Sequence, residues 1–324
     1  MSDDPAEVQV HGAGWAGLAI ARGLADAGVR VRLVDPAGVL GGASGRALGV
    51  ALPTHPEHPH RLEAGLGTAG AAALVAFIRE GLDALPGLAR VGVDWLASPQ
   101  ERGELDDALA AAARIGLGAT RTDAGYHLHD GGGVDLAALL AALRGPDPVP
   151  VHATAGTAEV DVYATGAVAL DPFLADKLTP VRWQAVHFDG PALAVPVVSQ
   201  HATVFWAGGL SAAGARWATP HMEVGETSPV PEPRVTAMLE RLTRAAFPDA
   251  GAILDVRAGI VAESCDGLPI VGPVPGRPRA VVCAGFGVAG LAYALPCARA
   301  VVDGLLGRPS AGVPKPLRTA RFAP

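Results

Sequence analysis

The amino-terminal region places a glycine-rich turn between a short apolar strand and a helix, which is the pattern of a dinucleotide-binding unit. Gly12, Gly14 and Gly17 form the sequence G-x-G-x-x-G. The first glycine permits a tight turn, the second lets the backbone approach a diphosphate, and the third lets the helix pack closely on the strand. A second apolar strand, Val29 to Val34, ends at Asp35, where a ribose hydroxyl needs an acceptor.

A glycine-rich surface turn followed by an incidental acid is the alternative interpretation of this segment. The strand, turn, helix and second strand occur in the expected order, and this context argues against a plain turn. We therefore expect the nucleotide to contact Gly12, Ala13, Gly14, Trp15, Ala16, Gly17, Asp35 and Pro36.

Length and charge limit the class of protein. The chain has 324 residues, enough for a large core and two domains, and a formal net charge of −7, which gives no sign of a nucleic-acid surface. The first residues are acidic and lack the basic and apolar regions of a secretory signal, so we expect a cytoplasmic protein. The uncharged stretch 280–298 contains glycines and Pro296, which favour a strand, a loop and a helix over a membrane span.

The chain has three cysteines and no C-x-x-C pair. We therefore expect neither a disulfide framework nor a cysteine zinc site. His55, His58 and His60 are separated by prolines and do not share one helix face, so we interpret them as loop histidines rather than metal ligands. We expect no metal site.

The order of apolar segments predicts an α/β protein with two interleaved domains. Strands typical of a parallel sheet occur near both ends of the chain, and short alternating strands occupy the middle. We expect a Rossmann-like dinucleotide-binding domain from residues 1–85, 130–170 and 255–324, and an antiparallel-sheet substrate domain from residues 86–129 and 171–254. The expected helices cover 62–85, as one long or two shorter helices, and 104–115, 135–143, 234–247 and 291–306, with a long loop at 208–233.

Several sequence blocks resemble the D-amino-acid-oxidase-like superfamily of FAD-dependent oxidoreductases. They are residues 12–35, 42–49 (GASGRALG), 163–166 (YATG), 266–273 (DGLPIVGP) and 285–291 (GFGVAGL). The resemblance implies FAD as the cofactor of the Rossmann-like domain. Within the superfamily, residues 42–45, 126–136 and 316–322 are most similar to the FAD domain of the bifunctional enzyme that modifies the tRNA wobble uridine.

The resemblance also identifies candidate flavin contacts beyond the first turn. Ser44, Gly45 and Arg46 could offer a hydroxyl, a backbone donor and a guanidinium to phosphate or ribityl oxygens, and a mobile surface loop is the alternative. Thr165 and Gly166 end an apolar strand, where ligands of open α/β sheets collect, and a plain turn is the alternative.

A further glycine-rich block precedes the last helix. Its backbone N–H groups and the N-terminus of the following helix are suited to face an electron-rich group of a ligand. In the resembling family this glycine-rich block lies against the flavin ring. Helix packing alone is the alternative role for its glycines. The candidate contacts are Gly285, Gly287, Val288, Ala289, Gly290 and Leu291.

Two positions depart from the pattern of the family. Many members have an arginine that anchors a substrate carboxylate where this chain has Val261, and Arg257 could replace it only if the loop is rearranged. The family's Gly-Gln pair appears here as Trp183-Gln184, so Trp183 forms either a pocket wall or simple core. Arg257, Trp183 and Tyr293 are the candidate substrate-binding residues.

The resemblance implies a flavoprotein that removes a hydride from the carbon next to an amine nitrogen and leaves an imine, which water hydrolyses. Reoxidation by oxygen would produce peroxide. We assign no catalytic side chain, because the flavin carries the chemistry. One alternative is oxidation of the carboxymethylaminomethyl group of a tRNA wobble uridine, which the acidic charge and the lack of a methyltransferase domain disfavour. Another is a non-catalytic FAD-binding partner protein. The residues leave open the substrate, the electron acceptor, the attachment of the flavin and the oligomeric state.

Overall fold

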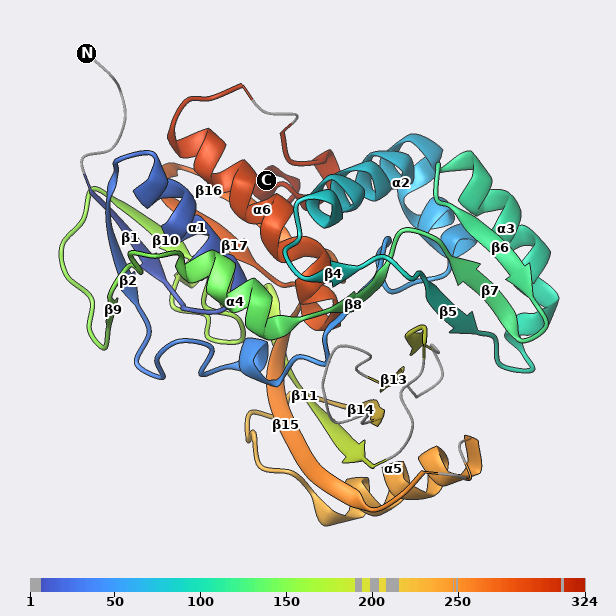
Figure 1. Cartoon of the computed structure of the whole chain (residues 1–324). Coiled ribbons are helices and arrows are strands. Elements are labelled where there is room, and N and C mark those ends of the chain that lie inside the picture. Colours follow the sequence, from blue (N-terminus) through green and yellow to red (C-terminus); the bar gives the residue numbers. More distant parts are fainter. Residues whose placement is uncertain are drawn as a thin grey trace. The chain divides into compact units, whose positions relative to one another are not determined.

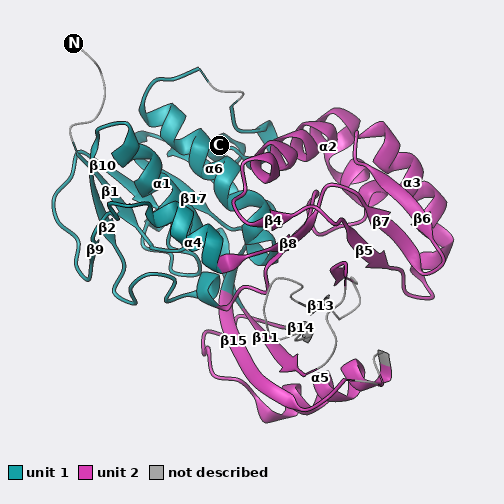
Figure 2. Cartoon of the chain, viewed as in Figure 1, with its two compact units in different colours: residues 1–45, 137–181, 261–324 teal, residues 46–136, 182–260 magenta. Residues whose placement is uncertain are grey.

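The computed structural model describes residues 7–189, 194–198, 204–207, 216–246, 248, 250–309 and 312–323. The chain folds into two compact units, each made from separated segments (Figure 2). Unit 1 contains residues 1–45, 137–181 and 261–324, and unit 2 contains residues 46–136 and 182–260.

Unit 1 is built on a six-stranded sheet in the order β16-β17-β10-β1-β2-β9. The inner strand β1 pairs in parallel with β2 and β10, and only the edge strand β16 runs antiparallel to its neighbour β17. Val8 and Val10 of β1 are fully buried, as expected for a strand covered on both faces. The strands are β1 (Glu7–His11), β2 (Arg30–Val34), β9 (Val151–His152), β10 (Val160–Tyr163), β16 (Ile270–Val274) and β17 (Arg277–Ala284).

Two helices of unit 1, α1 (Trp15–Asp26) and α6 (Gly290–Leu305), lie side by side against this sheet (Figure 1). A Cβ atom on Gly23 of α1 would lie 3.1 Å from a methyl carbon of Val302 in α6, so the glycine permits their close packing. The other helical elements of unit 1 are α4 (Leu136–Arg144), which begins at the boundary, and the short 3-10 turns η1 (Ala43–Arg46), η3 (Pro172–Leu174), η4 (Gly287–Ala289), η5 (Lys315–Leu317) and η6 (Thr319–Phe322).

The C-terminal segment is fastened to unit 1 by polar contacts. Arg321 donates two hydrogen bonds to the carboxylate of Asp266, at 2.6 and 2.9 Å, and another to the carbonyl of Pro269. The hydroxyl of Thr319 donates to the carbonyl of Pro273 at 2.6 Å. Residues 316–322 therefore have a structural role here, because they hold the turn that leads into β16.

Unit 2 contains an eight-stranded sheet in the order β15-β11-β14-β13-β12-β5-β7-β6 and a three-stranded sheet in the order β3-β8-β4. Most recorded pairs of the larger sheet are antiparallel, but β12 pairs with β5 in parallel. The strands are β3 (Val50–Ala51), β4 (Leu88–Ala89), β5 (Val93–Leu96), β6 (Ala119–Thr122), β7 (Gly125–Leu128), β8 (Gly132–Val134), β11 (Leu178–Phe188), β12 (Val197–Val198), β13 (Val204–Ala207), β14 (Arg216–Val224) and β15 (Ile253–Ser264).

The helices of unit 2 cover its apolar surfaces. Helix α2 (Pro59–Asp83) bends at Gly67, whose backbone is not helical, and packs on α3 (Leu105–Arg114), which follows the turn η2 (Glu101–Glu104). Helix α5 (Pro233–Ala246) buries Val235 and Leu239 against Val186 and Phe188 of β11.

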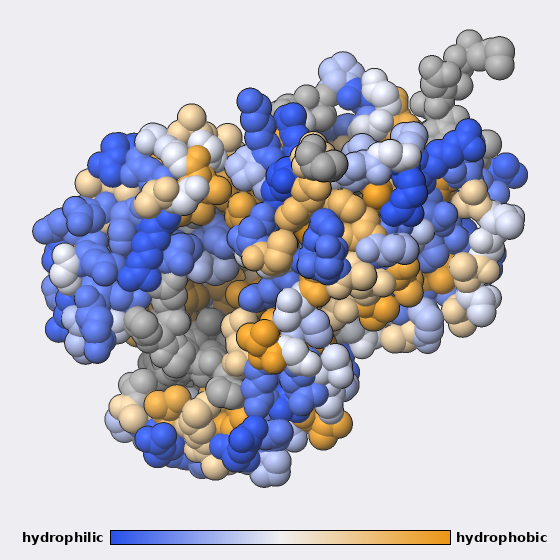
Figure 3. All heavy atoms as spheres, turned by 180° about the vertical axis from the view of Figure 1, so that it is seen from behind, coloured by the Kyte–Doolittle hydropathy of each residue, from blue (hydrophilic) through white to orange (hydrophobic). Residues whose placement is uncertain are grey.

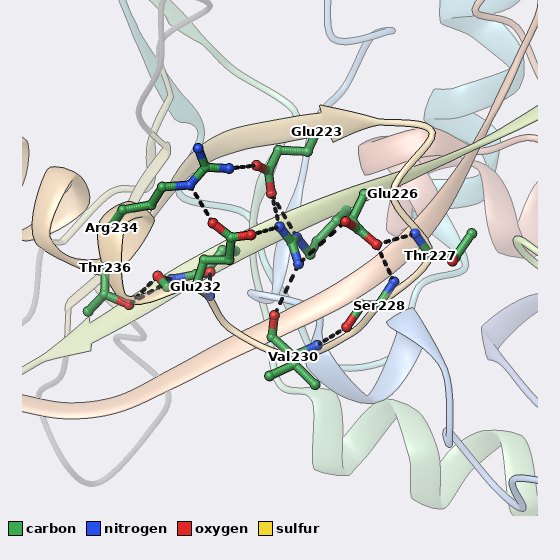
Figure 4. Close-up of polar contacts among 10 residues, drawn as sticks. Glu223, Glu226, Thr227, Ser228, Val230, Glu232, Arg234 and Thr236 are labelled. Carbon is green, nitrogen blue, oxygen red and sulfur yellow. Dashed lines mark hydrogen bonds and ion pairs between the residues drawn. The ribbon is translucent and has the colours of Figure 1, made fainter.

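An ion-pair cluster links β11, β14 and the start of α5 (Figure 4). The side chain of Arg182 in β11 is only 4% exposed, and it donates hydrogen bonds to Glu223 at 2.8 Å and to Glu232 at 2.9 Å. Arg234 contacts the same two carboxylates from the solvent side, and 74% of its side chain is exposed. The buried arginine is therefore held by two acids, each shared with an exposed arginine.

The observed elements differ from the expected ones in the middle of the chain. The segment 208–233, expected as a loop, contains β14 and the first residue of α5, while 208–215 lie outside the described residues. Strands β15 and β16 were not predicted, because their partly exposed residues lack a clear alternation. Residues 46–85, expected with the dinucleotide-binding domain, belong to unit 2 because α2 packs on α3.

Among the described residues, two helical segments are long and apolar enough to cross a membrane by length and composition alone, Pro59–Asp83 and Gly287–Leu305. In the second, 56% of the most apolar window is buried inside the fold, and the stretch 280–298 forms the expected strand, loop and helix. Hydrophilic and apolar residues are interspersed over the face shown in Figure 3. The apolar character of α6 follows from its place in the core of unit 1.

Candidate flavin-binding site

The turn after β1 has the geometry that its glycines require. Gly12 has a φ of +100°, and a Cβ atom on it would lie 2.3 Å from the carbonyl oxygen of Ala164. A Cβ atom on Gly17 would lie 1.8 Å from the carbonyl oxygen of Gly12. Because no side chain fits at either position, β1, α1 and the end of β10 meet backbone to backbone.

Ser44 and Trp15 lie at the start of α1. The backbone N–H of Trp15 donates to Ser44 Oγ at 3.2 Å, and a Cβ atom on Gly14 would lie 2.8 Å from the same oxygen. The indole Nε1–H of Trp15 is buried and has no hydrogen-bond partner among the described residues. A buried donor without a partner costs free energy, so this group is suited to an acceptor supplied by a ligand.

Asp35 holds the glycine turn from the end of β2. Its carboxylate accepts a hydrogen bond from the N–H of Ala13 at 2.8 Å and another from the N–H of Ala37 at 2.9 Å. The backbone N–H of Gly12 donates to the carbonyl oxygen of Val34 at 2.7 Å. Asp35 is therefore fixed at the tip of β2, and contact with a ribose remains a prediction for its free lone pairs.

A pocket in unit 1 connects the N-terminus of α1 with that of α6. It brings together parts of all the predicted cofactor blocks of this unit, because the strands that end there are neighbours in the sheet. None of its lining residues is charged. They are Gly14, Trp15, Ala16, Ser44, Ala164, Gly166, Val261, Ala262, Cys283, Ala284, Gly285, Phe286, Gly287, Gly290 and Ala294.

The strand order gives this pocket a direction. A dinucleotide with its diphosphate at the turn after β1 and its adenosine near Asp35 would occupy the β2 side of the sheet. Its other half would face the carboxyl ends of β10 and β17, which lie on the opposite side of β1. Gly285 and Gly287, with φ of +75° and +51°, shape the loop at this end. Helix α6 directly follows the turn η4, and its N-cap residue Ala289 makes no side-chain cap hydrogen bond.

The residues of this pocket fit FAD. Gly12 and Gly17 allow the turn and α1 to pack backbone to backbone, the N-termini of α1 and α6 lie at the pocket, and Trp15 has an unpaired indole N–H. Among the other predicted contacts, Thr165 donates its hydroxyl to the carbonyl of Val168, Ala289 and Leu291 are buried beside the loop, and Val288 is 54% exposed.

Arg46 and Trp183 lie together in unit 2. A Cβ atom on Gly259 of β15 would lie 3.3 Å from Arg46 Cδ and 3.2 Å from Trp183 Nε1. Trp183 is 6% exposed, and its indole packs against strand β15. Its burial agrees with a role in the core of this unit.

The other candidate substrate residues do not line the pocket of unit 1. Arg257 donates to Asp255 at 2.6 Å on the same strand, and its side chain is 42% exposed. Val261, at the position of the family's arginine, does line the pocket. Tyr293 is fully buried and stacks at 6.4 Å on Phe286, and burial raises the pKa of its phenol well above the usual value.

Of the three histidines expected in a loop, His55 and His58 lie in the segment before α2. His60 lies in the first turn of α2, and His58 is 1% exposed, with Nε2 at 2.7 Å from Glu101 and Nδ1 at 2.9 Å from the hydroxyl of Tyr126. Burial lowers the pKa of His55 to about 4. No group of metal-ligating side chains occurs within the described part of the chain.

Sequence reasoning missed several residues around the pocket. Ala164 and Phe286 adjoin predicted contacts, and the buried Cys283 also lines the pocket. Burial raises the pKa of the Cys283 thiol to about 12, so it is not a nucleophile at neutral pH. Glu263, discussed below, gave no sequence signal, because its place depends on the pairing of β15 with the loop after β17.

Comparison with known proteins agrees with this fold. Residues 7–147 and 138–304 match the DAO family of FAD dependent oxidoreductases. The chain belongs to this family, and FAD is its cofactor. No curated protein matched the chain.

Solved structures show the same fold at low sequence identity. Glycine oxidase from Geobacillus kaustophilus is 20% identical with a TM-score of 0.79, and the match covers 98% of this chain and 99% of that chain. L-proline dehydrogenase from P. horikoshii is 14% identical with a TM-score of 0.79, covering 98% of each chain. Iminodiacetate oxidase from Chelativorans sp. BNC1 is 20% identical with a TM-score of 0.70, covering 96% of this chain and 98% of that chain.

Proposed function

We propose that this FAD-dependent oxidoreductase oxidises the carbon–nitrogen bond of a small amine or amino-acid-like substrate. The observation that carries the proposal is the glycine cradle of unit 1, in which Gly12 and Gly17 leave no room for a Cβ atom and Trp15 offers an unpaired donor. Support for the substrate class comes from proteins of the same fold that are named for glycine, L-proline and iminodiacetate.

In this proposal the residues of unit 1 bind and orient the cofactor. The backbone N–H groups of the turn after β1 and the N-terminus of α1 bind the diphosphate. The indole N–H of Trp15 and the hydroxyl of Ser44 donate to polar atoms of the cofactor. The N–H groups between Gly285 and Gly290 stabilise negative charge at the other end of the pocket. When bound, FAD supplies a two-electron acceptor for the hydride that leaves the substrate carbon.

The oxidation of the substrate needs no further co-reactant from the protein. The carbon next to nitrogen loses a hydride and the nitrogen loses a proton, so that a carbon–nitrogen double bond forms. Water adds to this imine and releases a carbonyl compound and an amine. The apolar lining of the pocket, including Val261 and Phe286, limits access of water to the reacting carbon before the hydride leaves.

The first experiment tests the cofactor and the chemistry in sequence. Flavin released from the purified, denatured protein is identified, and the apoprotein is titrated with FAD and with FMN. We expect tight binding of FAD and weaker binding of FMN, which lacks the adenosine that the β2 side of the sheet would hold. The FAD-loaded protein is then mixed anaerobically with a panel of primary and secondary amines. We expect bleaching of the flavin and one carbonyl product per flavin reduced.

Different results identify the alternatives. Protein that neither contains nor binds FAD overturns the proposal. FAD-loaded protein that is photoreduced and then reoxidised by oxygen or a quinone, but that no amine reduces, is a non-catalytic partner protein. Accumulation of the carboxymethylated wobble nucleoside in a deletion strain would favour action on tRNA.

A further inference from the structure

We propose that Glu263 determines substrate specificity by favouring a cationic amine that carries no carboxylate next to the reacting carbon. This inference rests on the proposed function and narrows its substrate class. It depends on three features of unit 1, namely the face of β15 on which Glu263 lies, its contact with the loop after β17, and the charges around the pocket.

Glu263 directly follows two residues of β15 that line the pocket, Val261 and Ala262, and shares the strand face of Val261. Ala262 packs into the core cluster of unit 1 with residues that include Leu178 and Ile270, and the buried hydroxyl of Ser264 donates to the carbonyl of Leu268. Residues 261 and 263 therefore share the opposite face, because successive side chains of a strand point to opposite sides. Val261 lines the pocket on that face.

The contact with Gly287 brings the carboxylate of Glu263 to the end of the pocket. A Cβ atom on Gly287 would lie 3.4 Å from both Cγ and Oε1 of Glu263. Glu263 also forms an isolated antiparallel bridge with Phe286, and Phe286 and Gly287 both line the pocket. The acid is thus next to the loop that faces the second half of the dinucleotide, where a substrate must approach to react.

Glu263 brings an unpaired carboxylate to this end of the pocket. Within the described residues, the half-buried carboxylate of Glu263 makes no hydrogen bond or ion pair, and no pocket-lining residue is charged. Desolvation raises its pKa, as expected for an acid without a cationic neighbour. An unpaired negative charge in an apolar surrounding attracts an ammonium ion and repels a carboxylate. The position that carries the family's carboxylate-binding arginine holds Val261, so the two features act in the same direction.

The test compares a cation and an anion of similar size on the FAD-loaded protein. Binding of propylamine and of propionate is measured by the change in flavin absorbance, in the wild type and in Glu263→Gln. We expect the wild type to bind propylammonium more tightly than propionate. In the variant the ratio of the two affinities should fall about tenfold, which corresponds to about one hydrogen-bonded charge contact. Glu263→Gln should also raise the two-electron reduction potential, because reduction places negative charge near residue 287.

Controls separate this role from a general effect on folding. Glu7→Gln makes the same chemical change in unit 1 at the start of β1, and we expect it to alter neither the preference nor the potential. Glu263→Asp should keep the preference for the cation and Glu263→Asn should lose it, which repeats the comparison with a shorter side chain if the glutamine variant loses FAD.

Two outcomes are distinguishable. A wild type that binds no FAD or that no amine reduces contradicts the proposed function. A wild type that is reduced by amines, but whose selectivity and potential are the same in the Glu263 variants, contradicts only the inference about Glu263.

Discussion

The carbonyl oxygen of Ala164 lies 2.3 Å from the point that a Cβ atom on Gly12 would occupy. The contact joins the turn after β1 to the end of β10, which are far apart in the chain and adjacent in the sheet. The glycine is therefore required by a neighbouring strand as well as by its own φ of +100°. Four predictions follow from this and from other contacts of the two units.

Replacing Gly12 with alanine should abolish tight FAD binding. The new methyl group would collide with backbone, which cannot move aside as a flexible side chain can. We expect a fall in FAD affinity of at least about tenfold, measured by quenching of flavin fluorescence. Gly28→Ala is the control, because Gly28 also has a positive φ, +83°, but has no atom within 4 Å of its Cβ position. Equal loss of affinity in both variants would show that backbone strain, and not the contact with Ala164, decides binding.

Trp15→Phe should weaken FAD binding without destabilising the apoprotein. The variant removes a buried N–H that has no partner in the described chain, so the apoprotein loses no hydrogen bond. A hydrogen bond to the cofactor contributes about 0.5–1.5 kcal/mol, equivalent to roughly 2- to 13-fold in affinity. Thermal unfolding with and without FAD measures both effects. A variant that is less stable without FAD and equally stabilised by it would contradict the assignment of this N–H to the cofactor.

The pair of His58 and Glu101 should make the stability of unit 2 depend on acid pH. Burial acts to raise the pKa of Glu101, but its hydrogen bonds with His58 and Ser98 outweigh burial, so the pKa is lower than in the unfolded chain. Its contribution to stability is present above the unfolded pKa, near 4.5, and is lost as the pH falls through the folded pKa.

Glu101→Gln should remove this part of the acid dependence. The free energy of unfolding at pH 7 should fall by about 3–5 kcal/mol, because His58 loses its buried partner. Urea unfolding at several pH values between 3 and 7 measures the change. Glu159→Gln, at an exposed ion pair with Arg279, serves as the control and should change the pH profile little. A parallel profile for Glu101→Gln and the wild type would contradict the prediction.

Arg182 and Arg234 should contribute very differently to the stability of unit 2, although both contact Glu223 and Glu232. Arg182→Gln would leave these acids without their buried cation and should cost about 3–5 kcal/mol. Arg234→Gln removes an exposed partner and should cost less than about 1 kcal/mol. Chemical unfolding of both variants makes the comparison, and equal costs would mean that burial of Arg182 is not the source of its contribution.

Local segments of the fold could be predicted from the sequence because their contacts are local. The strand, turn and helix from β1 to α1 and the return strand β2 depend on glycine geometry and on apolar spacing within about thirty residues. Helices α3, α4, α5 and α6 have clear periodicity and were predicted within a few residues of their observed ends. Strands β15 and β16 could not be predicted, since their pattern of burial follows from their pairing with distant strands.

The residues of the candidate site also fall into those that local motifs predict and those that only strand pairing brings together. Gly12, Gly14 and Ser44 could be identified from motifs, whereas the place of Phe286 and Ala164 in the pocket could not, because it depends on which strands are neighbours. The buried network of His58, Glu101 and Tyr126 was missed for the same reason, since its members come from three separate segments of unit 2.

From its sequence alone, this protein is defined as a dinucleotide-binding α/β protein that resembles flavoprotein oxidoreductases, because a turn with required glycines and a following acid is specified within one continuous segment. Only the tertiary structure shows that Val261 lines the pocket and that Glu263 lies beside Gly287. These relationships depend on the pairing of strands far apart in the chain, and such pairing is decided by the packing of the whole unit rather than by any local pattern.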